Sequence, residues 1–459
     1  MTRPSTRRVG TVASLAAGGL TALALAWLVD LGTAQPSAGT SSASLEATHL
    51  PPLLTADDEV VELRYDAYCV AEEEAEAACD VSGVAHLRQG SSGPFREVPL
   101  LEDPRAAEGR WVAVVPSSVG RSPAGFSYYA VLRDTRTGAA VTLPAGGASA
   151  PQHSRPLGRP VVIALPDHSF GNAREASARV ASAPWGSGAG QVGLEQGRNL
   201  TPIGGTSFDV TADRAVHVLD EANGRILRWR AGSSVPDERA VEVNGTLADL
   251  ALSDDGTAYV LETTAKRGEP VLVRAFDASG RALGATPLAE RASQVRMGAR
   301  GQVLVLQHPS GQWMKAAADG RSLGAGAQRA SGRPGRPLPG GGEIVLLRHG
   351  SEIRVALVES GSVRQAWRLT SSTPLAEVQL AERLGSRVLV VVRTYADTRD
   401  EFRVLVLGRT GLVRAFTVDS ADWAESAPLS RFRLLGSSLY HLGSTPSGLF
   451  VDRFDLEVE

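Results

Sequence analysis

A repeat of about 40 residues in the C-terminal part of the chain constrains the fold more than any other feature of the sequence. The segments 208–210 (FDV) and 248–250 (ADL) lie 40 residues apart, and each is followed by an Asp-containing turn and a Val-rich run. The segment 280–285 (GRALGA) recurs 40 residues later at 320–325 as GRSLGA. Four-stranded repeats of about 40–45 residues are typical of β-propeller blades.

Continuing this spacing predicts a six-bladed propeller within residues 161–459, with seven blades as the alternative. The predicted blades span about 204–243, 245–288, 291–328, 335–370, 375–419 and 429–459. The last of them contains only three apparent strands, so a strand from elsewhere must complete it. The apolar run 161–165 (VVIAL) is the candidate, because closing the ring removes exposed sheet edges.

Residues 59–145 contain short apolar runs separated by turn signals, which predicts a small β-sandwich of immunoglobulin-like type. The expected strands are 60–65, 84–88, 96–100, 111–115, 127–134 and 139–143. Residues 35–58, rich in Ser, Ala, Thr and Pro, are expected to be a flexible linker, and the Pro- and Gly-containing segment 146–160 a second linker. The predicted fold class is therefore all-β throughout.

The N-terminal residues 1–34 predict export. Arg3, Arg7 and Arg8 precede the uncharged stretch 9–29, which is about long enough to cross a bilayer core of ~30 Å. Small residues at 32–34 (GTA) would suit signal peptidase, so the segment is either a cleaved signal peptide or a membrane anchor. Basic flanks stay in the cytoplasm. The expected protein is thus secreted or anchored outside the cytoplasm, and it meets the membrane only through this segment.

The two cysteines of the chain, Cys69 and Cys79, flank an acidic run that includes residues 72–74 (EEE). In an exported protein we expect a disulfide between them. A calcium site in this run is an alternative, but glutamate runs are usually solvated, and the spacing matches no EF-hand loop. Two cysteines without a Cys/His cluster do not make a four-ligand zinc site.

The charge and the histidines exclude several functions. A net charge of −3 removes the basic footprint of nucleic-acid binding. His217, His308, His349 and His441 fall in or just after second strands of their blades, which do not line the propeller axis. We therefore expect no nucleic-acid partner, no histidine metal centre and no catalytic residue.

One polar constellation is expected on the innermost strands, which line the axial channel. The repeat places five residues at similar positions there, with Arg336 near the skipped blade: Asp209, Asp249, Gln294, Glu377 and Arg431. Converging carboxylates could bind Ca²⁺ or a polar ligand. A ring neutralised by charge-assisted hydrogen bonds is the structural alternative, and we expect the structural role.

The stretch 204–229 (GGTSFDVTADRAVHVLDEANGRILRW) resembles an NHL-type propeller repeat. Asp220, Asn223, Arg225 and Ile226 match its Asp-x-x-Asn-x-Arg-Ile element, whereas Arg214 occupies the position of the usual turn glycine. The resemblance implies a propeller. It transfers no substrate, because propellers of this type include protein binders, lyases and lactonase-like hydrolases.

The sequence therefore predicts an extracytoplasmic binding or scaffolding protein whose propeller face holds a protein or a cell-envelope glycan. The alternative is a metal-dependent propeller enzyme, a lactonase-like hydrolase or lyase, in which Asp209, Asp249 and Glu377 hold Ca²⁺. The two predictions differ in the channel: an enzyme needs it open, whereas a scaffold tolerates a channel plugged by arginines such as Arg336 and Arg431.

Overall fold

The structure is a computed structural model that describes residues 44–70, 76–77, 80–105, 109–197, 201–244, 247–263, 270–288, 291–298, 301–307, 311–317, 333–338, 341–396 and 398–456. Strands dominate it. The helices of the described residues are α1 (Ser117–Gly120), η1 (Gly147–Ser149) and η2 (Glu221–Asn223). None of these is long and apolar enough to cross a membrane.

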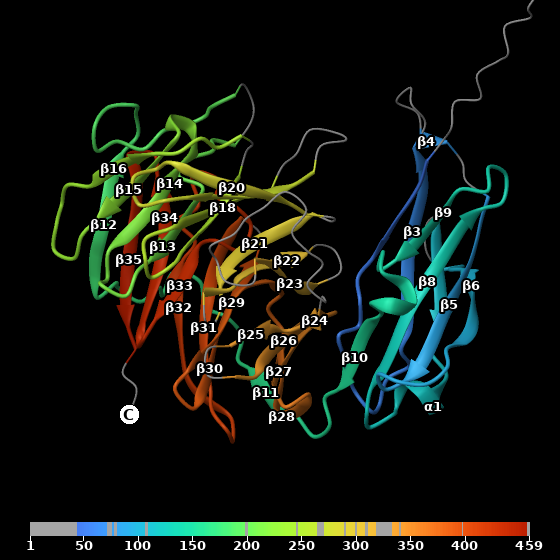
Figure 1. Ribbon diagram of the computed structural model, residues 1–459. Helices are drawn as coiled ribbons and strands as arrows, with labels where there is room; N and C mark the ends of the chain where they lie inside the picture. The colour runs from blue at the N-terminus through green and yellow to red at the C-terminus, as the bar shows by residue number, and fades with distance from the viewer. Residues whose placement is uncertain are drawn as a thin grey trace, which may run out of the picture. The chain divides into compact units, whose positions relative to one another are not determined.

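Six sheets are arranged as the blades of a β-propeller (Figure 1), which confirms the predicted fold class. Blade 1 contains β13 (Ser207–Val210), β14 (Val216–Asp220), β15 (Arg225–Trp229) and β16 (Asp237–Ala240). Blade 2 contains β17 (Asp249–Leu252), β18 (Ala258–Glu262), β19 (Leu272–Phe276) and β20 (Ala282–Pro287). Blade 3 contains β21 (Ala292–Met297), β22 (Val303–Gln307), β23 (Gln312–Ala317) and β24 (Arg333–Pro334).

Blade 4 contains β25 (Arg336–Pro337), β26 (Glu343–His349), β27 (Glu352–Glu359), β28 (Ser362–Ser371) and the added strand β11 (Val161–Leu165). Blade 5 contains β29 (Leu375–Leu384), β30 (Arg387–Ala396), β31 (Arg399–Leu407) and β32 (Leu412–Asp419). Blade 6 contains β33 (Phe432–Leu435), β34 (Ser438–Thr445), β35 (Gly448–Asp455) and β12 (Ala178–Pro184). Second strands such as β14 and β18 are buried at every position, because neighbouring blades cover both faces, and this explains why most of their residues are apolar.

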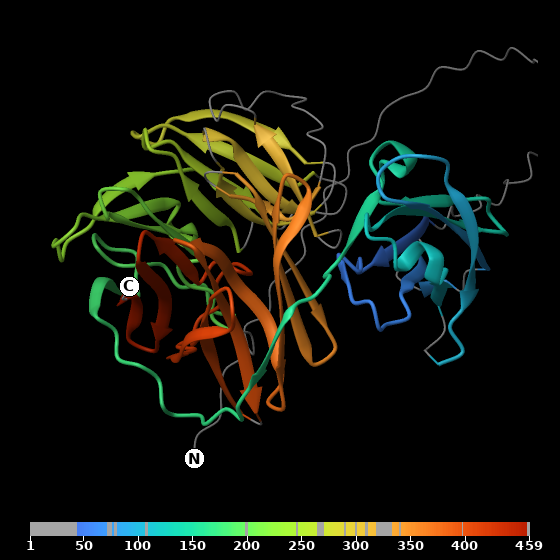
Figure 2. The ribbon, with the colours of Figure 1, turned by 90° about the horizontal axis from the view of Figure 1, so that it is seen from below.

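The strand that completes blade 6 is β12, so the prediction that residues 161–165 do so is wrong. β12 pairs antiparallel with β35, and β11 instead pairs parallel with β28 at the outer edge of blade 4. Residues 161–184, which we call the belt, therefore run from blade 4 to blade 6 (Figure 2). Between these strands the belt is fixed to blade 5, where Arg174 N–H donates to the Thr417 carbonyl at 2.8 Å.

The N-terminal module is also all-β, and its immunoglobulin-like type remains a prediction. Its strands are β1 (Ser44–His49), β2 (Leu54–Thr55), β3 (Glu62–Val70), β4 (Glu76–Ala77), β5 (Val81–Gln89), β6 (Arg96–Glu102), β7 (Arg110–Val114), β8 (Phe126–Asp134), β9 (Ala140–Leu143) and β10 (Gln152–Pro156). β6 pairs with β5 over most of its length and with β7 at its end, so it passes from one sheet to the other. Tyr65, Leu87 and Tyr128 belong to the core that these sheets enclose.

Two segments expected to be linkers contribute strands. β1 lies within the expected flexible linker 35–58 and pairs antiparallel with β3. Its last residue, His49, is buried and bonds through Nδ1 to the Arg64 carbonyl at 2.6 Å and through Nε2 to Tyr128 Oη at 2.7 Å. Burial lowers the pKa of His49 to about 4, so it is neutral. β10 lies within the expected linker 146–160 and pairs antiparallel with β8.

Residues 53–59 pack against blade 4. Leu54 is fully buried in an apolar cluster with Val345 and Ala356. Beside this cluster, Arg354 of β27 binds the carboxylate of Glu59. The segment between β2 and β3 is therefore attached to the propeller by both apolar and ionic contacts.

Candidate functional site

The residues of the predicted axial ring lie at different positions along the inner strands of their blades. In blades 1, 2 and 3, one residue of the inner strand lies opposite the fourth residue of the second strand. These residues occupy equivalent positions in their blades: Ser207, Asp249 and Gln294. Asp209 lies two residues beyond Ser207. Its equivalent in blade 3 is Arg296 by the same pairing. Because side chains alternate along a strand, all of these residues still share the channel-facing side.

Asp249 is fully buried and accepts four hydrogen bonds. Its Oδ1 accepts from Ser207 Oγ at 2.6 Å and from Arg433 Nη2 at 3.1 Å. Its Oδ2 accepts from the Val295 N–H at 2.9 Å and from Arg296 Nη1 at 2.6 Å. Burial raises the pKa of Asp249, but the two guanidinium groups, together with the Ser207 hydroxyl and the Val295 N–H, hold this pKa below its ordinary value. A carboxylate offers about four lone-pair sites, so Asp249 has none left for a ligand.

Arg433 of blade 6 contacts both aspartates of the predicted ring, Asp209 and Asp249. Its Nε lies 3.6 Å from Asp209 Oδ1, in addition to the contact with Asp249. Burial lowers the pKa of Arg433 to about 10 and raises the pKa of Asp209 from its ordinary value, although the arginine opposes the second shift. The remaining acceptors of Asp209 bind the N–H groups of Leu252 at 2.8 Å and Val210 at 2.9 Å.

The connection between β32 and β33 is bonded to the inner strand of blade 3. Its Leu429 carbonyl accepts from Gln294 Nε2 at 3.1 Å and from Arg296 Nη2 at 3.0 Å. Gln294 and Arg296 belong to blade 3, which stands opposite blade 6 in a ring of six. Leu429 adopts a φ of 61°, an unusual conformation for leucine that these bonds help to hold. Side chains of blade 3 and the segment before β33 are therefore joined by hydrogen bonds between opposite blades.

The other two predicted ring residues lie in a different environment. Glu377 Oε2 accepts from Gln379 Nε2 at 2.7 Å, and Arg431 Nη2 donates to the Ala424 carbonyl at 3.0 Å. Burial raises the pKa of Glu377 and lowers that of Arg431. In the part of the chain that the structure describes, neither forms an ion pair or hydrogen bond with Asp209 or Asp249.

The inner arginines were the part of the site that sequence reasoning missed. Arg296 lies two positions after Gln294, and Arg433 two positions after Arg431, so strand alternation places each on the channel side. Arg336, which was expected near the axis, forms an ion pair with Glu382 of β29, and burial lowers its pKa to about 9. Counting alternate positions on each inner strand would have found both missing residues.

The described residues contain no group of three or more His, Cys, Asp or Glu side chains that could hold a metal ion. His217 and His441 lie on the second strands β14 and β34. Burial lowers the pKa of each to about 3, so both are neutral. His308 lies outside the described residues.

The motif that resembles an NHL repeat builds a loop rather than a reactive site. Asp220 is buried, and its Oδ2 accepts from Asn223 Nδ2 at 2.8 Å and from Arg225 Nε at 2.9 Å. Its Oδ1 accepts the Gly193 N–H at 2.8 Å. Arg225 also donates to the carbonyls of Gly188 and Gln191. The matched residues therefore fix the β14–β15 hairpin against residues 186–193.

Cys69 is buried on β3, whereas Cys79 and the acidic run 72–74 lie outside the described residues. The disulfide and the calcium alternative in that run stay predictions. The export segment 1–34 also lies outside the described residues.

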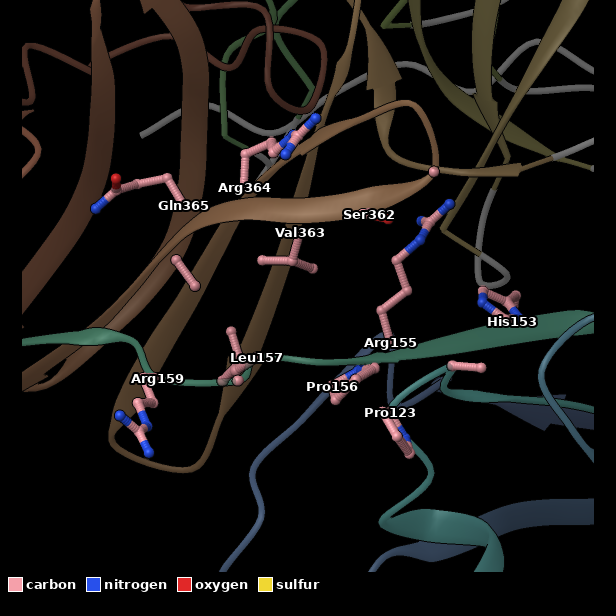
Figure 3. A pocket seen from close by; sticks show the side chains of 14 residues that line it. Pro123, His153, Arg155, Pro156, Leu157, Arg159, Ser362, Val363, Arg364 and Gln365 are labelled. Carbon is pink, nitrogen blue, oxygen red and sulfur yellow. The ribbon is translucent and has the colours of Figure 1, made fainter.

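A cavity of about 570 Å³ lies beside β10 and the β27–β28 hairpin (Figure 3). Three arginines line it, but the guanidinium groups of Arg159 and Arg364 point in opposite directions. Arg155 faces Glu343 at 3.7 Å, and Arg364 lies 4.0 Å from Glu359. The positive charges do not converge, and two of them have carboxylates nearby. This cavity is therefore a weak candidate for an anion site.

No family model and no curated protein matches the chain. Similar solved structures include the Kuenenia stuttgartiensis hydrazine synthase, with 12% identity, 55% of this chain and 87% of that chain covered, and a TM-score of 0.35. Virginiamycin B lyase from Staphylococcus aureus has 8% identity, coverages of 54% and 94%, and a TM-score of 0.32.

A gluconolactonase from Xanthomonas campestris has 14% identity, coverages of 61% and 99%, and a TM-score of 0.33. At these scores the likenesses carry no argument about function. The class of protein is defined by the chain's own strands: an all-β protein with a six-bladed propeller.

Proposed function

We propose that the chain is a binding or scaffolding protein that acts outside the cytoplasm and holds a protein or a cell-envelope glycan on one face of its propeller. The observation that carries this proposal is that the inner polar groups bond to one another: Asp249 accepts four hydrogen bonds, and the Leu429 carbonyl is bound by Gln294 and Arg296 from the opposite blade. A propeller enzyme with its site on the axis needs free polar groups there, and this chain uses its own groups to neutralise one another.

The face we propose for binding carries the β30–β31 hairpin, the β14–β15 hairpin and the connection between β32 and β33. These loops are fixed by internal hydrogen bonds, such as those of Asp220 with Asn223 and Arg225. Loops held by a rigid scaffold are the usual place for recognition, and preorganised loops bind with a smaller loss of conformational entropy.

The immunoglobulin-like type of the N-terminal module and the NHL type of the propeller belong to this proposal. Both kinds of module occur in proteins that hold partners. The extracytoplasmic location rests on Arg3, Arg7 and Arg8 before the apolar stretch 9–29. The alternative of a calcium-dependent enzyme has less support, because the four hydrogen bonds accepted by Asp249 occupy the oxygens that a cation would need.

The test combines a binding assay with a turnover assay on the full chain. Co-sedimentation with cell envelopes of the source organism, intact or stripped of protein by protease, measures binding and separates a glycan partner from a protein partner. Lactone, ester and lyase substrates, with and without Ca²⁺, measure turnover. We expect binding to intact envelopes, which protease treatment preserves for a glycan partner and abolishes for a protein partner, and no turnover above the uncatalysed rate.

Two charge reversals at opposite ends of blade 5 provide the matched variants. Glu425→Arg changes an exposed residue on the proposed face, and Arg409→Glu changes an exposed residue at the β31–β32 hairpin on the other face. We expect Glu425→Arg to weaken envelope binding and Arg409→Glu to leave it unchanged. Calcium-dependent turnover, or equal effects of the two variants, would overturn the proposal.

A further inference from the structure

An open depression on the proposed face is lined by side chains of blade 5. It encloses about 430 Å³, and its walls are the start of β29 and the tip of the β30–β31 hairpin. Its polar and aromatic lining consists of Glu377, Arg393, Tyr395, Thr398, Arg399 and Asp400. Glu377, which was expected in the axial ring, lies here instead.

Two irregularities of β29 shape this depression. The pairing of β29 with β30 shifts between Leu375 and Val378 and again between Val378 and Leu380. Glu377 lies within the first shift and is left out of the ladder. A β-bulge re-aims the side chain that it carries, and bulges are frequent next to functional sites. The bulge explains why the side chain of Glu377 does not lie with the other side chains of the predicted axial ring.

The walls of the depression are held in place by other side chains. Thr394 Oγ1 donates to the Pro374 carbonyl at 2.9 Å, which fixes the hairpin to the start of β29. Arg393 Nε donates to Asp400 at 2.6 Å, and its Nη2 lies 3.2 Å from Asp422. The guanidinium of Arg399 lies 5.3 Å from the ring centre of Phe170 in the belt. A ligand would therefore meet a preorganised surface.

The lining is electrically balanced and includes an exposed aromatic ring. Two carboxylates, Glu377 and Asp400, are matched by two guanidinium groups, Arg393 and Arg399. Tyr395 is 45% exposed, although aromatic side chains usually bury most of their surface. A neutral lining with both acceptors and donors suits an uncharged ligand with many hydroxyl groups, and the ring offers an apolar face for stacking.

We infer that this depression, which we call the Tyr395 site, binds a neutral sugar ring of an envelope glycan. The inference rests on the proposed function and narrows its partner to a glycan. The ring of Tyr395 stacks on the apolar face of the sugar. The carboxylates of Glu377 and Asp400 accept hydrogen bonds from sugar hydroxyls, while Arg393 and Arg399 donate to sugar oxygens.

Calorimetric titration of the full chain with neutral oligosaccharides tests the inference. The probes are tetrasaccharides of N-acetylglucosamine, glucose and mannose, and hyaluronate serves as the anionic comparator. We expect at least one neutral probe to bind. Tyr395→Ala is expected to weaken it at least about tenfold, which corresponds to about 1.4 kcal/mol. Tyr68→Ala, which removes a tyrosine that is 39% exposed on β3, is the matched control and should leave the affinity unchanged.

Each other outcome overturns the inference. Binding of hyaluronate alone would show an anion site, and binding of no probe would exclude a neutral sugar site. Equal effects of Tyr395→Ala and Tyr68→Ala would place the sugar elsewhere. If Tyr395→Ala keeps its thermal stability and its envelope binding while no sugar binds, the inference fails and the proposed function stands. Calcium-dependent turnover would instead remove the proposed function.

Discussion

Arg354 of blade 4 binds both carboxylate oxygens of Glu59, at 2.7 Å from Nη1 to Oε1 and 2.5 Å from Nη2 to Oε2. Arg354 is only 1% exposed, and its Nε also donates to Glu352 at 2.6 Å. Burial disfavours the charge of Arg354, but the two glutamates outweigh it and raise its pKa. The segment before β3 is therefore attached to the propeller by a desolvated ion pair.

Replacing Arg354 by methionine tests the energetic weight of this attachment. Arg354→Met leaves Glu59 without its main counter-charge and removes one of the two arginines that bind Glu352, and breaking a buried pair on one side costs about 3–5 kcal/mol. Urea denaturation should show this loss in the free energy of unfolding. Arg364→Met is the control, because its side chain is 62% exposed and exposed pairs contribute less than about 1 kcal/mol. Similar losses in both variants would contradict the expectation.

Replacing Asp249 by asparagine tests the axial network. Asp249→Asn removes the negative charge that faces Arg296 and Arg433, both of which are buried. We expect a loss of about 3–5 kcal/mol in the free energy of unfolding. Asp213→Asn alters an aspartate that is 56% exposed beside Arg228, and it should cost less than about 1 kcal/mol. If Asp249→Asn proved as stable as the wild type, the network would not hold the inner strands together.

The carboxyl group of Glu221 predicts a pH-dependent stability. Burial raises its pKa from 4.5 to about 7, even though its Oε2 accepts the Ala248 N–H at 3.0 Å. Because the pKa in the folded state is the higher one, the native state prefers the protonated form. The stabilisation from this group is complete below pH 4.5 and is lost as the pH rises through about 7.

Glu221→Gln should remove this pH dependence. Its stability relative to the wild type should increase between pH 5 and pH 8, by at most about 3 kcal/mol. Urea denaturation at several pH values measures the difference. Glu102→Gln, at an exposed side chain of β6, should show no such trend. A constant difference between Glu221→Gln and the wild type would show that Glu221 titrates normally.

Calcium and a chelator test the alternative of a metal-dependent enzyme. Asp249 accepts hydrogen bonds from two arginines. Glu377 lies in the Tyr395 site and not beside Asp249. We therefore expect the melting temperature of the full chain to be the same with Ca²⁺ and with chelator. Elemental analysis of the purified protein provides the second readout. One equivalent of bound calcium, lost in chelator together with several degrees of melting temperature and with turnover, would restore the enzyme hypothesis.

The sequence predicted the number of blades because each blade repeats one apolar second strand. The segments that form β14, β18 and β22 consist mostly of apolar residues, which the sequence shows directly. The closing strand was harder to predict. β12 buries only small residues, Ala181 and Ala183, whereas the stronger apolar pattern at residues 161–165 belongs to an added strand of blade 4.

The axial residues could be predicted only in part. A count of residues from blade to blade assumes connections of equal length, yet Asp249 is equivalent to Ser207 and not to Asp209. The bulge in β29 changes the direction of Glu377, and nothing in the local sequence marks it. The position of Leu429 depends on tertiary contacts with Gln294 and Arg296 of the opposite blade. Such contacts between distant segments leave no periodic signal in the sequence.

The belt also constrains how this propeller is made. β11 and β12 are synthesised before any inner strand of the ring, yet their partners, β28 and β35, belong to blades 4 and 6. During translation each belt strand stays unpaired until its partner strand has been synthesised. The ring can close only after Asp455, the last residue of β35, has left the ribosome. Such late, long-range pairing slows folding and leaves strand edges exposed in the meantime. Nascent chains that stop before β33 should therefore be the form most in need of chaperones.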